Sequence, residues 1–249
     1  MQFSDTHVHL QDFKTRFATD IVRAALEKGV DKLVCVSAAE KDWEKVAGLH
    51  ELFPRNIIPA FGLHPWYVRE ASAGWEERLE ACLRKYPRAL VGETGLDRLH
   101  DGDEEPQGAA FSRQIDLARA YGRPLIIHAV RAQDWLEKYW KILPEKFVFH
   151  SFAASAELLA KVAAHGGYAG FSFSILRSRH KERVLKAVPP DRILLETDGP
   201  YQGPEKGREV EPSRLPELAR ELAEVRGLEF PGFAARVYQN SLEFLNIGK

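Results

Sequence analysis

Six side chains that commonly ligate metal ions stand in or just after short apolar runs: His7, His9, Glu93, His128, His150 and Asp198. Imidazole nitrogens together with carboxylate oxygens suit divalent transition metals. Within Asp5-Thr6-His7-Val8-His9, the alternation of a strand would place both imidazoles on the same side. An isolated His-x-His pair is a weak signal. Three further histidines and two acids in equivalent positions make a metal centre the better interpretation.

Glu93, in the segment VGETGLD, can do what an imidazole cannot, because its two oxygens can bind two cations at once. It is the natural bridge between a first ion, held by His7, His9 and Asp198, and a second ion, held by the remaining two histidines. Its apolar approach favours burial, and an unpaired buried carboxylate would be costly. The sequence therefore predicts two divalent ions, with Zn, Mn, Co, Ni, Fe and Mg as candidates.

Asp198 follows the apolar run Ile193 to Leu195 and could combine two roles. It can ligate the first ion and take a proton from an attacking water, so Asp198 and Glu93 are the predicted catalytic residues. Glu196 lies two residues earlier and could point the same way, so the chemistry alone leaves it open. Such a centre predicts metal-assisted hydrolysis.

Four further side chains are candidates for substrate binding. His64, in FGLHPW, could bind an oxyanion or phosphate, or could be a packed structural residue. Arg177 and Arg179 follow a predicted strand, where a charge run is either a solvated face or a phosphate contact. Arg131, three residues after His128, has similar standing. Trp66 and Tyr67 are interpreted as surface or core aromatic residues near the same rim.

Eight short apolar segments alternate with amphipathic stretches and can position these residues: 2–7, 32–36, 56–61, 89–92, 124–127, 147–149, 168–171 and 193–195. Continuous apolar strands are typical of parallel strands covered on both faces. Eight β/α units in a chain of 249 residues predict a single-domain (β/α)8 TIM-type barrel over residues 1–249, with an extra C-terminal helix at 233–244. The carboxyl ends of all strands then converge on one rim.

Composition narrows the class of partner. The net charge of −1 argues against a long electrostatic track for nucleic acid, so a nucleic-acid substrate would bind through the metals or a local patch. Two cysteines suggest no disulfide framework. No apolar stretch approaches the length of a membrane span, and no signal peptide is apparent. We therefore expect a cytoplasmic protein that does not bind a membrane and needs no protein partner.

The motifs resemble those of the TatD family of metal-dependent deoxyribonucleases, in chain order: SDTHVHL at 4–10, FGLHP at 61–65, VGETGLD at 91–97, PLIIHA at 124–129, FHSF at 149–152 and LLETDGPY at 194–201. The resemblance implies a TIM-type barrel and phosphodiester hydrolysis, commonly of DNA. It also implies the metal ligands named above, Glu93 as the bridge, Asp198 as catalytic acid/base and His64 as a substrate-site residue.

The chain departs from that family on loops that would contact the substrate. Arg98-Leu99 replaces a frequent aromatic pair, and Ala129-Val130-Arg131 follows His128 where Ser-Arg is frequent. Two alternatives follow. The same site could hydrolyse an ester or amide, as in D-aminoacyl-tRNA deacylation, although many amidohydrolases use a modified lysine where this chain has Glu93. A metal-binding protein without turnover is the second alternative.

Overall fold

The computed structural model describes residues 1–100, 102–205 and 207–247. Eight parallel strands are hydrogen-bonded in chain order, each to the next. They are β1 (Phe3–Val8), β2 (Val30–Val36), β3 (Ile57–Phe61), β4 (Leu90–Asp97), β5 (Leu125–Val130), β6 (Phe147–Phe149), β7 (Tyr168–Phe171) and β8 (Ile193–Leu195). All eight predicted strands are present, and β4 continues five residues beyond its predicted end.

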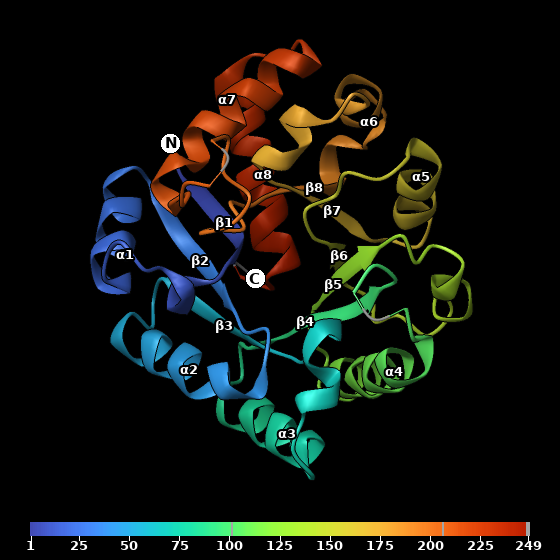
Figure 1. Ribbon diagram of the computed structural model, residues 1–249. Coiled ribbons are helices and arrows are strands. Elements are labelled where there is room, and N and C mark those ends of the chain that lie inside the picture. The colour runs from blue at the N-terminus through green and yellow to red at the C-terminus, as the bar shows by residue number, and fades with distance from the viewer. Residues whose placement is uncertain (101, 206, 248–249) are drawn as a thin grey trace.

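The outer layer consists of helices that follow the strands, arranged as a ring around the sheet (Figure 1). They are α1 (Ala18–Glu27), α2 (Trp43–Leu52), α3 (Trp75–Lys85), α4 (Glu104–Ala120), α5 (Ala156–Ala164), α6 (Lys181–Ala187) and α7 (Leu215–Arg226). The connection from β5 to β6 contains only the short 3-10 helix η4 (Trp135–Lys138). Further 3-10 helices lie in the loops: η1 (Leu10–Asp12), η2 (Glu40–Asp42), η3 (Pro65–Glu70), η5 (Phe173–Arg177), η6 (Pro190–Arg192) and η7 (Pro212–Arg214).

The predicted C-terminal helix is present as α8 (Phe230–Phe244), which begins three residues earlier than expected. Figure 1 looks along the barrel axis, and α8 lies behind the ring of strands. Phe244 and Leu245 pack with inward-facing residues of the strands, such as Val34 and Ile126. The C-terminal helix therefore fills the far end of the barrel, and the near end stays available for a site.

Strand alternation separates two apolar cores. Val34 and Val36 of β2 face the barrel interior, whereas Leu33 and Cys35 face the larger core beneath the helices. Both sets are buried, which explains why the strands are continuously apolar in sequence. None of the helices in the described part of the chain is long and apolar enough to cross a membrane.

The circle closes between β8 and β1 by a different pattern from the other strand pairs. Beyond the end of β8, Asp198 N donates to His7 O at 2.9 Å, and His9 N donates to Gly199 O at 2.7 Å. The Thr6 hydroxyl also donates to Leu195 O at 3.0 Å. The barrel is thus nearly closed, and its last seam is made where two predicted ligand-bearing segments meet.

Candidate metal centre

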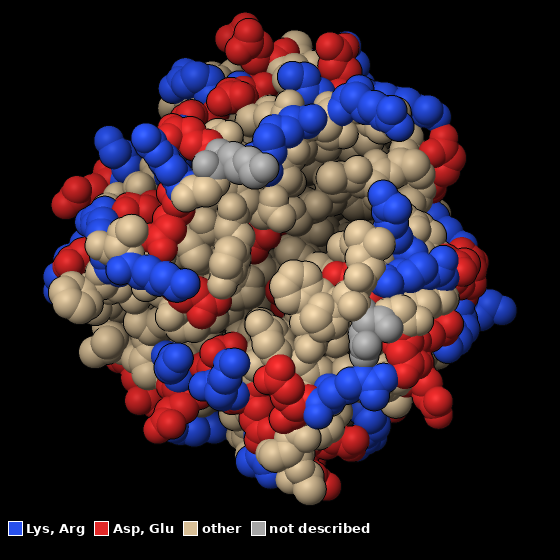
Figure 2. All heavy atoms as spheres, viewed as in Figure 1, with Lys and Arg blue, Asp and Glu red and all other residues tan. Residues whose placement is uncertain are grey.

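The six predicted ligands meet on the side of the barrel where the strands have their carboxyl ends. They come from five segments: the end of β1, the middle of β4, the second half of β5, the residue after β6 and the segment after β8. Figure 2, drawn from the same side as Figure 1, shows a hollow at the centre of this face. The hollow is bordered mostly by uncharged side chains, and acidic atoms are visible inside it. This is the location that a TIM-type barrel uses for chemistry.

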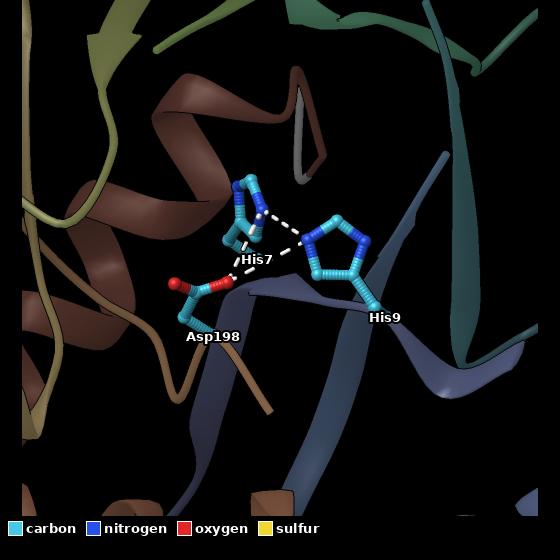
Figure 3. A group of neighbouring side chains, drawn as sticks. All are labelled: His7, His9 and Asp198. Atoms are coloured by element: carbon cyan, nitrogen blue, oxygen red, sulfur yellow. Dashed lines mark hydrogen bonds and ion pairs between the residues drawn. The ribbon is translucent and has the colours of Figure 1, made fainter. Parts of the chain in front are cut away.

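His7, His9 and Asp198 form the first group of candidate ligands (Figure 3). The two imidazole Nε2 atoms lie 3.1 Å apart. Asp198 Oδ1 lies 3.7 Å from Nε2 of His7 and 3.6 Å from Nε2 of His9. Asp198 reaches this position with a φ of 53°, a left-handed conformation that aspartate tolerates better than most residues. The three ligand atoms thus converge from β1 and the segment after β8.

His128 and His150 form a second pair on the β5 and β6 side. His128 Nδ1 lies 3.1 Å from His150 Nε2. Two nitrogens that bind one ion at about 2.0–2.1 Å are separated by about 2.8–3.4 Å between right-angled and tetrahedral geometry. The spacing within each histidine pair fits a shared cation.

Glu93 lies between the two pairs, with one oxygen toward each. Its Oε2 lies 3.4 Å from His7 Nε2 and 3.6 Å from His9 Nε2. Its Oε1 lies 2.9 Å from His128 Nδ1 and 2.7 Å from His150 Nε2. This division of the two oxygens is the arrangement expected of a carboxylate that can bind two cations at once.

Hydrogen bonds outside the cluster orient two of the imidazoles. His9 Nδ1 lies 2.9 Å from Val36 O and must donate to this carbonyl, so its Nε2 lone pair faces the cluster. His128 Nε2 lies 3.2 Å from Asp97 Oδ2 and donates to it, so Nδ1 presents the lone pair. Both rings therefore offer a nitrogen in the form that a metal requires.

His64 has the opposite protonation pattern. Its Nδ1 accepts from Trp66 N at 3.1 Å, so the neutral ring carries its proton on Nε2. This Nε2 lies 3.5 Å from Glu93 Oε1. Distance alone groups His64 with Glu93 and His128 as possible ligands, but a protonated nitrogen cannot bind a cation. His64 is thus a hydrogen-bond donor that faces the cluster.

Burial and the Glu93 carboxylate together shift the pKa values in the cluster. It lowers the pKa of His7 to about 4 and holds that of His64 well below its usual value, so both rings are neutral at pH 7. Burial also raises the pKa of Asp198 well above its usual value. For His150, burial opposes the charged form, but the Glu93 carboxylate outweighs it and raises the pKa well above the usual value. Neutral His7 is ready to bind a cation.

Three buried carboxylates support the ligands. Asp97 accepts from Trp66 Nε1 at 2.7 Å as well as from His128. Asp5 accepts from Thr197 N at 3.0 Å and Thr197 Oγ1 at 2.6 Å, across the seam of the barrel. Glu196, which the sequence left open as a ligand, lies beneath the cluster, with Oε1 3.7 Å from His150 Nδ1 and hydrogen-bonded to Ser151 N.

Asp97 was missed by sequence reasoning, although the sequence held a signal for it. Glu93 and Asp97 are four residues apart, so a strand continuing through VGETGLD puts both on one face. The predicted strand ended at Gly92, before either residue. Near Asp97, the ring of His100 is stacked on Trp66 with centroids 5.1 Å apart.

The predicted phosphate-binding arginines lie outside the cluster. Arg177 donates to Gly203 O at 2.5 Å, and Arg179 donates to His180 at 3.0 Å. Arg131 is exposed just after β5, with a φ of 48°. Within residues 1–100, 102–205 and 207–247, no hydrogen bond or ion pair joins these three side chains to the candidate ligands. Their role in binding substrate stays a prediction.

Comparisons with known proteins agree on one group. A family model described as TatD related DNase matches residues 4–246. The human "Deoxyribonuclease TATDN3" is 30% identical, covering 96% of this chain and 93% of its own. The "3'-5' ssDNA/RNA exonuclease TatD" of Erwinia tasmaniensis is 27% identical, covering 94% and 96%. A crystal structure of the TatD homologue YjjV from Escherichia coli K12 aligns with a TM-score of 0.90 at 28% identity, covering 99% and 98%.

Proposed function

Because the chain belongs to the TatD related DNase family and is thus a metal-dependent hydrolase, we propose that it hydrolyses DNA phosphodiesters with two divalent ions bridged by Glu93. The observation that carries the proposal is the position of Glu93 between two imidazole pairs. One oxygen lies 2.7 Å from His150 Nε2, and the other lies 3.4 Å from His7 Nε2.

Six residues would hold the two ions. His7, His9 and Asp198 would bind the first ion, and His128 and His150 would bind the second. Glu93 would bind both ions. Divalent ions bound there would neutralise charge on a phosphate and lower the pKa of a bound water. The imidazole-rich ligand set suits Zn, Mn, Fe, Co or Ni, and Mg would need the more open position.

Asp198 and His64 carry the remaining roles. The Asp198 carboxylate lies 3.7 Å from His7 Nε2 and 3.6 Å from His9 Nε2, so it would be close to a water bound by the first ion and could take a proton from it. The Nε2–H of His64 points into the cluster and can donate to a phosphate oxygen, because its Nδ1 is already engaged by Trp66 N. His64 thus binds substrate rather than metal.

DNA is the proposed substrate because one relative is named a deoxyribonuclease and another is named an ssDNA/RNA exonuclease. Arg131, Arg177 and Arg179 lie in or near the loops of the rim and are the proposed cationic contacts to phosphates away from the metals. The net charge of −1 limits how many phosphates such contacts can hold.

Turnover by metal-stripped protein tests the proposal. Single-stranded DNA and bis(p-nitrophenyl) phosphate are supplied with Mn, Zn, Co or Mg added back, using wild type, Glu93→Ala and Glu51→Ala. Glu51 is a matched control because it is an acid near the C-terminal end of α2 that pairs with Lys85 at 3.2 Å, outside the cluster. We expect cleavage that requires metal, is lost in Glu93→Ala and is kept in Glu51→Ala.

Two results would contradict the proposal. Binding of a single ion per chain at saturation, measured by elemental analysis, would refute the bridging role of Glu93. Absence of phosphodiester cleavage with two ions bound would redirect the assignment to an ester or amide, and aminoacyl-tRNA would be the substrate to try next.

A further inference from the structure

Two exposed aromatic rings flank the candidate metal centre on opposite sides of the rim. Trp66 lies over the β4 and β5 side, and Tyr201 follows β8 and lies beside His9 of the β1 side. In the ring of strands, β8 and β1 lie opposite β4 and β5. On the premise that the proposed function holds, we infer that these rings stack the unpaired bases of the nucleotides on either side of the scissile phosphate.

Trp66 is fixed in place but leaves ring surface in solvent. Its indole N–H donates to Asp97 Oδ2 at 2.7 Å, and His100 stacks on it at 5.1 Å with an interplanar angle of 19°. The side chain is nevertheless 46% exposed. His100 covers part of the ring, so a base would stack on the ring surface that His100 leaves in solvent. The ring is also perpendicular to that of His64, with centroids 5.1 Å apart, so Trp66 lies next to the metal centre.

Tyr201 repeats this arrangement across the site. Its hydroxyl donates to Asp12 Oδ2 at 2.8 Å, and its ring meets His9 edge-on at 5.6 Å. The side chain is 61% exposed. Each ring is thus tethered to a carboxylate by its polar tip, next to an imidazole of the cluster. A tethered ring loses little conformational freedom when a ligand stacks on it.

Aromatic stacking is an interaction by which this mostly uncharged rim can bind nucleotides. Figure 2 shows mostly uncharged surface around the hollow, with Lys and Arg along its upper and right-hand edges. Stacking on aromatic rings accepts any base, since every base has a flat π-face. Bases inside a duplex are already stacked and paired, and exposing them costs free energy. The two rings therefore select unpaired nucleotides and tolerate any sequence.

The test separates the rings from their hydrogen bonds. Metal-loaded wild type is compared with Trp66→Gln and Tyr201→Ala, which lose the ring, and with Trp66→Phe and Tyr201→Phe, which keep a ring but lose the polar tip. Leu52→Ala is the control, because Leu52 is similarly exposed (65%) at the C-terminal end of α2, which faces the far end of the barrel. Substrates are a short oligothymidylate and the same oligonucleotide with abasic residues.

We expect KM for oligothymidylate to rise about tenfold for each ring removed, and to stay near the wild-type value in the Phe and Leu52 variants. On the abasic oligonucleotide, all variants should match wild type in KM. Trp66→Phe has a second expected effect, a lower kcat, because it releases the Asp97 carboxylate that orients His128. Equal KM values in the ring-deleted variants and wild type, or equal losses on both oligonucleotides, would overturn the inference.

Binding keeps this result separate from the proposed function. Fluorescence anisotropy of labelled oligothymidylate with metal-stripped protein needs no turnover. Wild type that cleaves no phosphodiester would contradict the proposed function. If that protein still binds oligothymidylate, and ring removal weakens the binding about tenfold, the stacking inference is supported independently. If binding is unchanged by ring removal, the stacking surfaces are wrong.

Discussion

Asp97→Asn tests whether the second histidine pair depends on a carboxylate outside the cluster. Asp97 Oδ2 accepts from His128 Nε2 at 3.2 Å and from Trp66 Nε1 at 2.7 Å. Its Oδ1 accepts from Leu99 N at 2.9 Å. An asparagine has one oxygen and one NH2, so it must turn a donor toward Leu99 N or toward both rings. Either orientation loses a hydrogen bond and the negative charge.

The expected magnitude follows from the role of such partners. Removing the outer partner of a metal-binding histidine typically costs about 10–100-fold in metal affinity or activity. This range corresponds to about 1.4–2.7 kcal/mol. The backbone of Asp97 remains held by Gln107, which bonds its N–H at 2.7 Å and its carbonyl at 3.0 Å, so the strand stays in place. We therefore expect weaker binding of one ion without loss of the fold.

The assay is competition for Zn or Mn between metal-stripped protein and a chromophoric chelator, analysed for two sites. Asp42→Asn is the matched control, because Asp42 is a buried carboxylate that accepts from Ala39 N at 3.0 Å and has no contact with the cluster. It should lower Tm and leave both affinities unchanged. If Asp97→Asn folds and binds both ions within twofold of wild type, the argument that Asp97 orients His128 is refuted.

Three further predictions concern the fold and the cofactor. Gly95→Ala should destabilise the protein by more than about 3 kcal/mol in urea unfolding, because its Cβ would lie 2.0 Å from His128 O at a φ of 141°. The control Gly122→Ala, at a φ of 60° with open space around the Cβ, should cost only about 1 kcal/mol. Equal losses in the two variants would contradict the steric argument. Burial raises the pKa of Cys35 to about 12, so this thiol stays protonated at pH 8 and a disulfide reagent should label only Cys82 in native protein; labelling of both would be contrary. A chelator should lower Tm and excess metal should restore it, with little response in Glu93→Ala; an equal response in this variant would place the metal elsewhere.

The eight strands could be predicted because a parallel barrel buries both faces of each strand. The continuous apolar run from Leu33 to Val36 is an example, since its alternate side chains enter two different cores. The end of β4 could not be predicted in this way. Gly95 and Asp97 belong to the strand because they pair with His128 and Val130 of β5, and such pairing is a tertiary fact that local composition does not carry.

The candidate ligands were predictable because they share one topological place, and the structure brings all six together. Their tautomers were not, because each depends on a contact from another element: Val36 O for His9, and Asp97 for His128. For the predicted substrate-binding arginines, the sequence indicated the charge and the loop but not the contacts of the side chains. Arg177 has the right charge and loop, but its guanidinium donates to Gly203 O, which the sequence could not indicate.

The seam between β8 and β1 links the chemistry to the fold. β8 ends at Leu195, and beyond it the two segments are held by Asp198 N to His7 O and by the buried Asp5–Thr197 pair. Burial raises the pKa of Asp5 to about 7, so this carboxyl accepts hydrogen bonds at some cost in desolvation. His7 and His9 lie on one side of the seam and Asp198 lies on the other. Among the described residues β8 and β1 are not paired as strands, so a cation held by all three would join the two sides of the seam, and metal affinity and barrel closure should depend on the same few hydrogen bonds.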